Sequence, residues 1–135
     1  MTWELFFFAV VLFQIKHFIC DFPLQNSYML GKFKERGWVL PLASHAAVHV
    51  VGTLVTLTVF QWIAGLGTWS LIPSLALLDG VIHFAIDRIK ASPKLLGRYK
   101  PNEPEFWYCL GADQMAHHIT HYVLLAVFIA SGARP

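Results

Sequence analysis

Asp113–His121, which reads DQMAHHITH, opens a long apolar run that continues to Ile129. Within this stretch Asp113, His117 and His121 recur every fourth residue. On a helix of about 3.6 residues per turn, such positions form one stripe along one face. A carboxylate and two imidazoles on one face are the ligands that a transition metal prefers. The stretch therefore predicts a helix with a metal-binding face, and solvation or capping at a helix start is the simpler alternative.

The chain around this stretch is strongly apolar. It has 135 residues, of which 56% are hydrophobic and 13% charged, whereas soluble domains carry about a quarter charged residues. Four apolar stretches approach the roughly 20 residues that cross a bilayer as a helix. They predict helices at about 3–22, 39–64, 69–90 and 106–131. We therefore expect an all-α integral membrane protein, an up-down four-helix bundle in which residues 1–135 form a single domain.

Tryptophan and basic residues predict how the bundle sits in the bilayer. All five tryptophans fall at expected helix ends, where interfacial aromatic belts form: Trp3, Trp38, Trp62, Trp69 and Trp107. The first and third connections carry nearly all the lysines and arginines, and the second, residues 65–68, carries none. The positive-inside rule then places the first and third connections in the cytoplasm and both termini outside, with only Arg134 against it. The net charge of +2 reflects these connections, so no nucleic-acid partner is expected.

Three further segments carry polar residues at the same helical spacing. They are His17, Asp21 and Gln25 in the first helix, His45 and His49 in the second, and Asp79, His83 and Asp87 in the third. Pro23 interrupts the first of these stripes, because proline removes a helical hydrogen bond. In an up-down bundle all four stripes lie at the cytoplasmic end, within about two turns of the inner face, and all can point inward. Cys20 and Cys109 lie near the same boundary and are expected to be buried free thiols, with Cys20 as a metal ligand the alternative.

The converging stripes predict a buried metal site. Nine residues are candidate ligands: His17, Asp21, His45, His49, His83, Asp87, Asp113, His117 and His121. Ionisable groups at membrane depth cost several kcal/mol unless they are paired or bound to a metal. The donor set suits one or two divalent transition metal ions, with zinc preferred and iron or manganese as alternatives. A hydrogen-bonded polar layer that only specifies helix packing is the competing interpretation.

Other residues are expected to support the site. Asp21 or Asp87 is the candidate proton shuttle. A second group is expected to orient the ligands or to hold a phosphate or carboxylate: Gln25, Asp79, Gln114, Lys32, Arg88 and Lys90. For the cations among them, ordinary positive-inside residues are the simpler interpretation. Lys16 is expected to extend its ammonium group to the inner membrane interface.

Several of these segments together resemble a known family. The segments are His17–Gln25 (HFICDFPLQ), His83–Lys90 (HFAIDRIK) and Asp113–His117 (DQMAH), with Lys32 and the two histidines of the second helix. On them the chain resembles a bacterial membrane family catalogued as domain of unknown function 3307, over nearly its whole length. The resemblance implies a multi-pass protein of the bacterial inner membrane with a His/Asp site. It implies no activity.

Four functions are compatible with such a site. A metal-dependent hydrolase of a lipid or amphipathic substrate fits best, because the site lies close to the depth of the head groups and a bound metal activates water. A divalent cation or proton transporter or sensor is the second, although the outer half of the bundle has few polar groups besides threonines. A di-iron oxidase and a haem protein are the others. The lipid bilayer is the expected partner, and the sequence leaves open a monomer or a homodimer.

Overall fold

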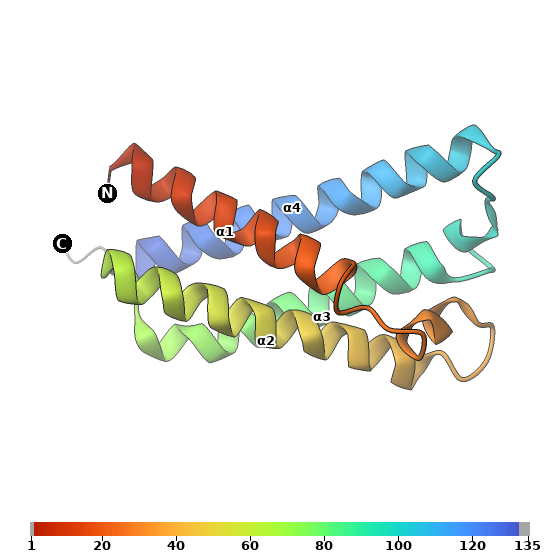
Figure 1. Ribbon diagram of the computed structural model, residues 1–135, viewed down its shortest axis with the longest axis horizontal. Helices are drawn as coiled ribbons and strands as arrows, with labels where there is room; N and C mark the ends of the chain where they lie inside the picture. The colour runs from red at the N-terminus through yellow and green to blue at the C-terminus, as the bar shows by residue number, and fades with distance from the viewer. Residues whose placement is uncertain (1, 133–135) are drawn as a thin grey trace.

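The computed structural model describes residues 2–132, which form four long helices (Figure 1). These are α1 (Trp3–Asp21), α2 (Val39–Ala64), α3 (Ile72–Ala91) and α4 (Pro104–Gly132). Three short 3₁₀ helices lie in the connections: η1 (Met29–Phe33), η2 (Trp69–Leu71) and η3 (Leu96–Arg98). There is no strand in residues 2–132. Successive long helices run in opposite directions (Figure 1), so the predicted all-α, up-down arrangement is confirmed. Arg134 lies outside the described residues.

The bundle has an apolar exterior and a partly polar interior. Large apolar side chains are exposed on its surface, among them Phe7 at 63%, Trp62 at 82% and Leu77 at 61%. His45, His49 and His121 are by contrast fully buried. Soluble proteins show the reverse distribution, because burying polar groups is costly and water solvates them well. All four long helices are also long and apolar enough to cross a membrane, so the chain has the character of an integral membrane protein.

The interior is divided into two halves along the bundle axis. An apolar cluster fills the half near the α2–α3 connection: Ala9, Phe13, Leu57, Phe60, Ile72, Leu75, Leu124, Leu125 and Phe128. The other half, toward the α1–α2 and α3–α4 connections, holds the buried histidines and aspartates. The polar half is thus at the end of the molecule that carries most of the basic residues.

The α1–α2 connection folds back over the polar half. Helix α1 ends at Asp21, two residues before Pro23, and Leu24 N donates to the Ile19 carbonyl at 3.0 Å. The chain then enters η1, which packs on the start of α2: a Cβ added to Gly31 would lie 2.8 Å from Cγ of Pro41. A side chain at Gly31 would therefore push η1 away from α2. This close approach lets Lys32 of η1 reach into the bundle.

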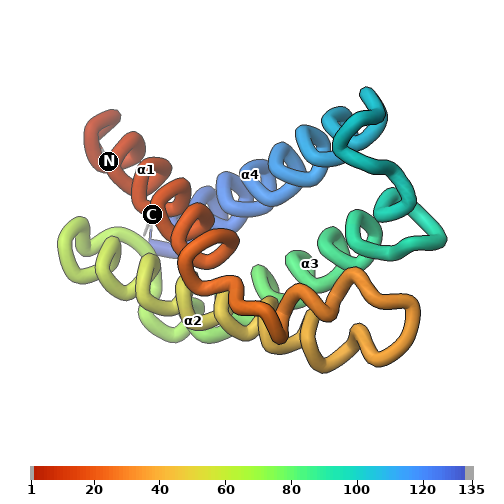
Figure 2. Tube along the Cα trace, turned by 45° about the vertical axis from the view of Figure 1, so that its right-hand side comes forward, coloured from red at the N-terminus to blue at the C-terminus, as the bar shows by residue number. Residues whose placement is uncertain are grey.

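Small residues bring α2 close to both of its neighbours. A Cβ at Gly80 of α3 would collide with Val50 of α2. A Cβ at Gly52 of α2 would lie 2.8 Å from Sγ of Cys20 in α1. Small residues are the usual means by which membrane helices pack closely. Among neighbouring long helices, α1 and α4 touch least, and Figures 1 and 2 show them crossing and then diverging toward the end where α1 stops.

Candidate metal centre

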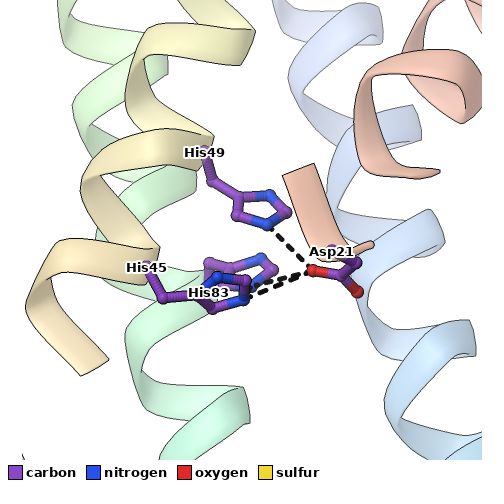
Figure 3. A group of neighbouring side chains, drawn as sticks. All are labelled: Asp21, His45, His49 and His83. Carbon is purple, nitrogen blue, oxygen red and sulfur yellow. Dashed lines mark hydrogen bonds and ion pairs between the residues drawn. The ribbon is translucent and has the colours of Figure 1, made fainter. Parts of the chain in front are cut away.

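Four residues from three helices form the centre of the polar half (Figure 3). Asp21 comes from the last turn of α1, His45 and His49 from the first turns of α2, and His83 from α3. Nε2 of His49 lies 2.9 Å from Oδ1 of Asp21, and Nε2 of His45 lies 3.3 Å from the same oxygen. Nε2 of His83 is 3.3 Å from Nε2 of His45 and 3.9 Å from Oδ1 of Asp21. Three imidazole nitrogens therefore face one carboxylate oxygen.

These separations match those around a single zinc ion. With bonds of about 2.0–2.1 Å and a tetrahedral angle, two ligand atoms lie about 3.3 Å apart. Four of the separations between these donor atoms run from 2.9 to 3.9 Å, and all of the donor atoms lie within 4.8 Å of one another. A neutral imidazole binds a metal through a nitrogen lone pair, and each of these residues offers one donor atom within reach of the others. Asp21, His45, His49 and His83 could hold a divalent ion; we call them the primary group.

A second group overlaps the first at His83. It consists of His83, Asp87 and His117. Oδ1 of Asp87 lies 3.7 Å from Nε2 of His83 and 3.3 Å from Nε2 of His117. One imidazole nitrogen binds one ion, and the same Nε2 of His83 faces both groups. The two groups therefore form one complete metal site and a second site that lacks a ligand when His83 binds the first ion.

An unsatisfied nitrogen in the second group supports the metal interpretation. Nε2 of His117 is buried and lies 3.3 Å from Oδ1 of Asp87 and 3.5 Å from Oδ1 of Asp113, but it makes no hydrogen bond of good geometry among the residues described. Buried polar atoms without a partner are rare in native structures. The His83 ring stacks between His49 and His117, with centroids 3.5 and 4.1 Å apart. Two charged rings would repel each other at such distances, so the stacking favours a neutral imidazole at His83, the form that binds metals.

Lysines neutralise three of the four aspartates. Each makes a short ion pair between Nζ and a carboxylate oxygen: Lys16 with Asp79 at 2.6 Å, Lys32 with Asp87 at 2.5 Å and Lys90 with Asp113 at 2.7 Å. Asp21 has no lysine or arginine partner among the described residues; imidazoles surround it instead. The carboxylate without a cation is thus the one in the primary group.

A second polar layer lies one turn deeper in the bundle. Asp79 receives Nζ of Lys16 at 2.6 Å and the hydroxyl of Thr53 at 2.5 Å. Nε2 of His121 lies 3.5 Å from the other oxygen of Asp79 and 3.3 Å from Nζ of Lys16. The ammonium of Lys16 and the carboxylate of Asp79 compensate each other here, as buried charges at membrane depth require.

The structure brings six of the nine predicted ligands into the two groups: Asp21, His45, His49, His83, Asp87 and His117. The other three lie next to them. Nε2 of His17 is 3.2 Å from Oδ2 of Asp21 and 3.1 Å from the side-chain oxygen Oε1 of Gln114. Asp113 is held by Lys90, and His121 belongs to the deeper layer. Helical spacing places residues on one face, but the depth along the helix decides which of them meet.

The predicted supporting residues are found in different surroundings. Gln114 contacts both His17 and Asp113. Asp79 contacts His121 rather than His83. Lys32 and Lys90 are engaged by aspartates and are not free to hold a substrate. The Arg88 guanidinium stacks on Trp38 with its carbon 3.6 Å from the ring centroid. Gln25 lies beyond the end of α1 and makes no side-chain hydrogen bond among the described residues.

Lys16 corrects the sequence analysis. It was expected at the membrane interface, but it is only 5% exposed and its ammonium is bound inside the bundle. The position of Lys16 in the sequence already indicated that its ammonium is buried. Lys16 lies deeper in the apolar run than His17, where an ammonium group needs a counter-ion, and Asp79 is the aspartate at the matching depth of α3. Cys20 and Cys109 are free thiols, as expected.

Comparison with known proteins identifies the family without assigning an activity. No curated protein and no solved structure is similar enough to this chain to count as a match. A family model, however, matches residues 8–133, a range that contains the primary group, the second group and all three lysine–aspartate pairs. The chain therefore belongs to the family described as protein of unknown function (DUF3307).

Proposed function

We propose that this protein is a membrane-embedded, metal-dependent hydrolase that acts on a lipid or another amphipathic substrate. A divalent transition metal, with zinc the best fit, would be held by Asp21, His45, His49 and His83. When bound, such an ion acts as a Lewis acid and lowers the pKa of a coordinated water toward neutrality. The observation that carries the proposal is the convergence of three Nε2 atoms on the one aspartate that lacks a lysine partner.

Charge favours one ion over two. With neutral imidazoles, the four aspartates and their three lysine partners leave one net negative charge in the polar half. A single divalent ion reverses this to one positive charge, which a substrate anion or hydroxide would neutralise. Two divalent ions would leave a larger net positive charge, and uncompensated charge at membrane depth costs several kcal/mol.

Asp87 is the candidate proton acceptor. It lies next to the primary group, with Oδ2 3.4 Å from Nε2 of His45. Lys32 binds the same oxygen and His117 faces the other one. A carboxylate held between these groups is oriented to take a proton from a water in the site and to pass it toward His117.

The apolar half of the bundle supports chemistry over transport. A conduction path needs polar groups or water along its whole length. Phe13, Phe60 and Phe128 lie fully buried in the apolar cluster that fills that half. A site open from one side suits an enzyme whose substrate arrives at the inner surface of a bacterial plasma membrane. The basic connections support a site near the cytoplasm, with both termini outside.

Metal content and hydrolysis test the proposal. The untagged full chain is purified in mild detergent, and bound metals are measured by elemental mass spectrometry. We expect about one zinc, iron or manganese ion per chain, lost in Asp21→Asn. The matched control is Asp113→Asn, which removes an aspartate outside both groups and is expected to keep the ion.

Metal-dependent hydrolysis of 4-nitrophenyl dodecanoate or of a phospholipid vesicle would then support the proposed enzyme activity. An absence of metal in reconstituted parent protein would exclude the metalloenzyme.

A further inference from the structure

A long apolar groove runs between α1 and α2 on the lateral surface of the bundle. Its volume is about 560 Å³, and we call it the α1–α2 groove. Its walls include exposed aliphatic side chains from both helices: Ile15, Ile19, Val51, Val55 and Val59. Both helices are long and apolar enough to cross a membrane. The groove is therefore a depression in a surface that faces the hydrocarbon of the bilayer.

The floor of the groove offers apolar surface although a lysine lies in it. A Cβ added to Gly52 would lie 3.1 Å from Cγ and 3.2 Å from Cε of Lys16, so the stem of this lysine passes along the floor. Its ammonium points into the bundle, where it binds Asp79 at 2.6 Å. The thiol of Cys20, also in the floor, donates to the Val48 carbonyl at 3.7 Å. Both polar groups thus have partners in the protein, and the occupant of the groove meets mainly methyl and methylene groups.

The length of the groove matches the depth of one leaflet. On α2 it extends from Ser44 to Val59, which is about 22 Å at the rise of an α-helix. On the other side it extends from Leu12 to Leu24. The hydrocarbon core of a bilayer is about 30 Å thick, so the chains of one leaflet reach about 15 Å. A single extended acyl chain can therefore lie in the groove along its whole length.

The size and chemistry of the groove exclude water and a helix as its occupant. A bound water needs two to four polar partners, which aliphatic walls do not supply. A helix about 22 Å long and 10 Å across has a volume of about 1,700 Å³, roughly three times that of the groove. Empty space would forfeit dispersion contacts with the walls. An acyl chain is narrow and is supplied by the bilayer itself, so it is the occupant that fits.

The groove lies beside the metal centre. On α2, Val48 lines the groove and directly precedes His49. On α1, Cys20 lines the groove and directly precedes Asp21. Consecutive residues of a helix point about 100° apart, so the groove and the ligands occupy neighbouring faces of the same two helices. One end of the groove is therefore level with the primary group, and the other end, at Val59, lies in the apolar half of the bundle.

We infer that the α1–α2 groove holds one long acyl chain of the substrate, with the polar end of the substrate level with the metal centre. The inference rests on the proposed function and adds which part of the substrate is bound and where. A chain that lies along α1 and α2 keeps the attached polar group next to the face that carries Asp21 and His49. The substrates that fit are amphiphiles with at least one long acyl chain, and a second chain would stay in the bilayer.

Photolabelling in a bilayer tests the inference. The full chain is reconstituted into dioleoylphosphatidylcholine vesicles without detergent, because detergent chains would compete for the groove. The probe is hexadecanoate that carries a diazirine in the middle of its chain, and the labelled residues are identified by mass spectrometry. We expect the label to concentrate on the middle of the groove, at Val51 and Val55. It should be rarer at Leu77 and Val81 of α3, which are equally exposed but lie outside the groove.

Two matched valine variants locate the binding site. Val51→Phe places a ring in the groove, and Val81→Phe places the same ring on the surface of α3. The two valines are 58% and 59% exposed. Labelling of Val55 and Ile19 should fall about fivefold in Val51→Phe, in line with the usual cost of overpacking an apolar site. It should stay at the parental level in Val81→Phe, and both variants should keep the metal content of the parent.

Three other results would overturn the inference. Equal labelling of all exposed positions would mean that acyl chains contact the groove only as they contact the rest of the surface. Unchanged labelling in Val51→Phe would mean that the chain lies elsewhere. A groove without label, together with disulfide-linked dimers of Val55→Cys in a background with Cys20→Ala and Cys109→Ser, would assign the groove to a second copy of the chain.

The proposed function can fail separately from this inference. Labelling needs no metal, so Asp21→Asn should be labelled like the parent. A parent protein that binds no metal but is labelled in the groove would contradict the hydrolase and support the acyl-chain site. A parent protein that binds zinc and hydrolyses 4-nitrophenyl dodecanoate, but shows no preferred label in the groove, would contradict the acyl-chain site alone.

Discussion

At the scale of single residues, charge compensation explains most of the polar half. Each of Asp79, Asp87 and Asp113 meets a lysine from another segment of the chain, at 2.5 to 2.7 Å. Ionised groups cannot remain unpaired at this depth. Asp21 departs from this pattern, and it is also the aspartate on which three imidazoles converge. The absence of a lysine partner therefore distinguishes Asp21, the candidate ligand, from the three lysine-paired aspartates.

The Lys16–Asp79 pair gives a prediction about stability. Lys16→Met leaves Asp79 buried without its cation and should lower the free energy of unfolding by about 3–5 kcal/mol. Adding Asp79→Asn removes the uncompensated charge while an amide still accepts from Thr53. The double variant should therefore be more stable than Lys16→Met alone. Thermal unfolding in detergent, followed by circular dichroism, measures both, and a double variant less stable than the single one would contradict the prediction.

The sequence predicted the ligand types well and their partners less well. Spacing by four residues placed Asp21, His49 and His83 on inward faces, because helical periodicity alone determines this. It could not show that Lys32 returns to Asp87, because that contact depends on how residues 22–38 fold back over α2. Lys16 was misplaced for a related reason. A long flexible side chain can reach the interface or an internal carboxylate, and only the packing decides.

At the scale of elements, close helix contacts hold the site together. Helix α2 supplies two histidines and lies against both α1 and α3 through Gly52 and Gly80. The four helices themselves were predictable, since length and apolar composition suffice to identify spanning segments. The tightness of their packing was not, because a glycine in an apolar run gives no indication of the side chain that will face it.

Two glycine substitutions test the role of this packing. Gly80→Ala places a methyl group against Val50 and should destabilise the bundle by about 1–3 kcal/mol through overpacking. Gly111 in α4 has no neighbouring atom within 4 Å of an added Cβ, so Gly111→Ala should leave the melting temperature unchanged or raise it. Metal content after gentle purification should fall only in Gly80→Ala. Equal melting temperatures for the two variants would argue against close α2–α3 packing.

At the scale of the whole molecule, polarity is distributed along one axis. The apolar cluster occupies one half of the bundle, and the histidines, aspartates and basic connections occupy the other. Metal binding would join three of the four helices at one site and stabilise the fold, because a ligand that binds only the folded state stabilises it by mass action.

Chelation should therefore lower the stability of the entire bundle. Removing the ion from the purified protein should decrease the melting temperature, and adding zinc should restore it. The Asp21→Asn variant serves as the control, since it should melt at the same temperature with and without chelator. Differential scanning fluorimetry of the native tryptophans measures the shift. An unchanged melting temperature in the parent would indicate that no folded-state ion had been removed.

The membrane orientation gives a fourth prediction. In a background with Cys20→Ala and Cys109→Ser, single cysteines replace Arg36 in the first connection or Thr68 in the second. A maleimide that cannot cross membranes should label Thr68→Cys in intact cells, because the connection without basic residues is expected outside. Arg36→Cys should react only after the cells are broken. The opposite labelling pattern would reverse the proposed orientation.

The Lys16–Asp79 ion pair also bears on how the chain is assembled during synthesis. Helices α1 and α2 form one hairpin and α3 and α4 another, and the pair joins the two. Before they meet, the first hairpin presents an unpaired ammonium to the lipid and the second an unpaired carboxylate. Each hairpin is then energetically unfavourable in the bilayer by itself, because it holds an unpaired charge. Each is most stable when it is packed against the other. When the two hairpins are produced as separate fragments, they should therefore associate in the membrane. The attraction between the opposite charges would favour this association before any metal binds.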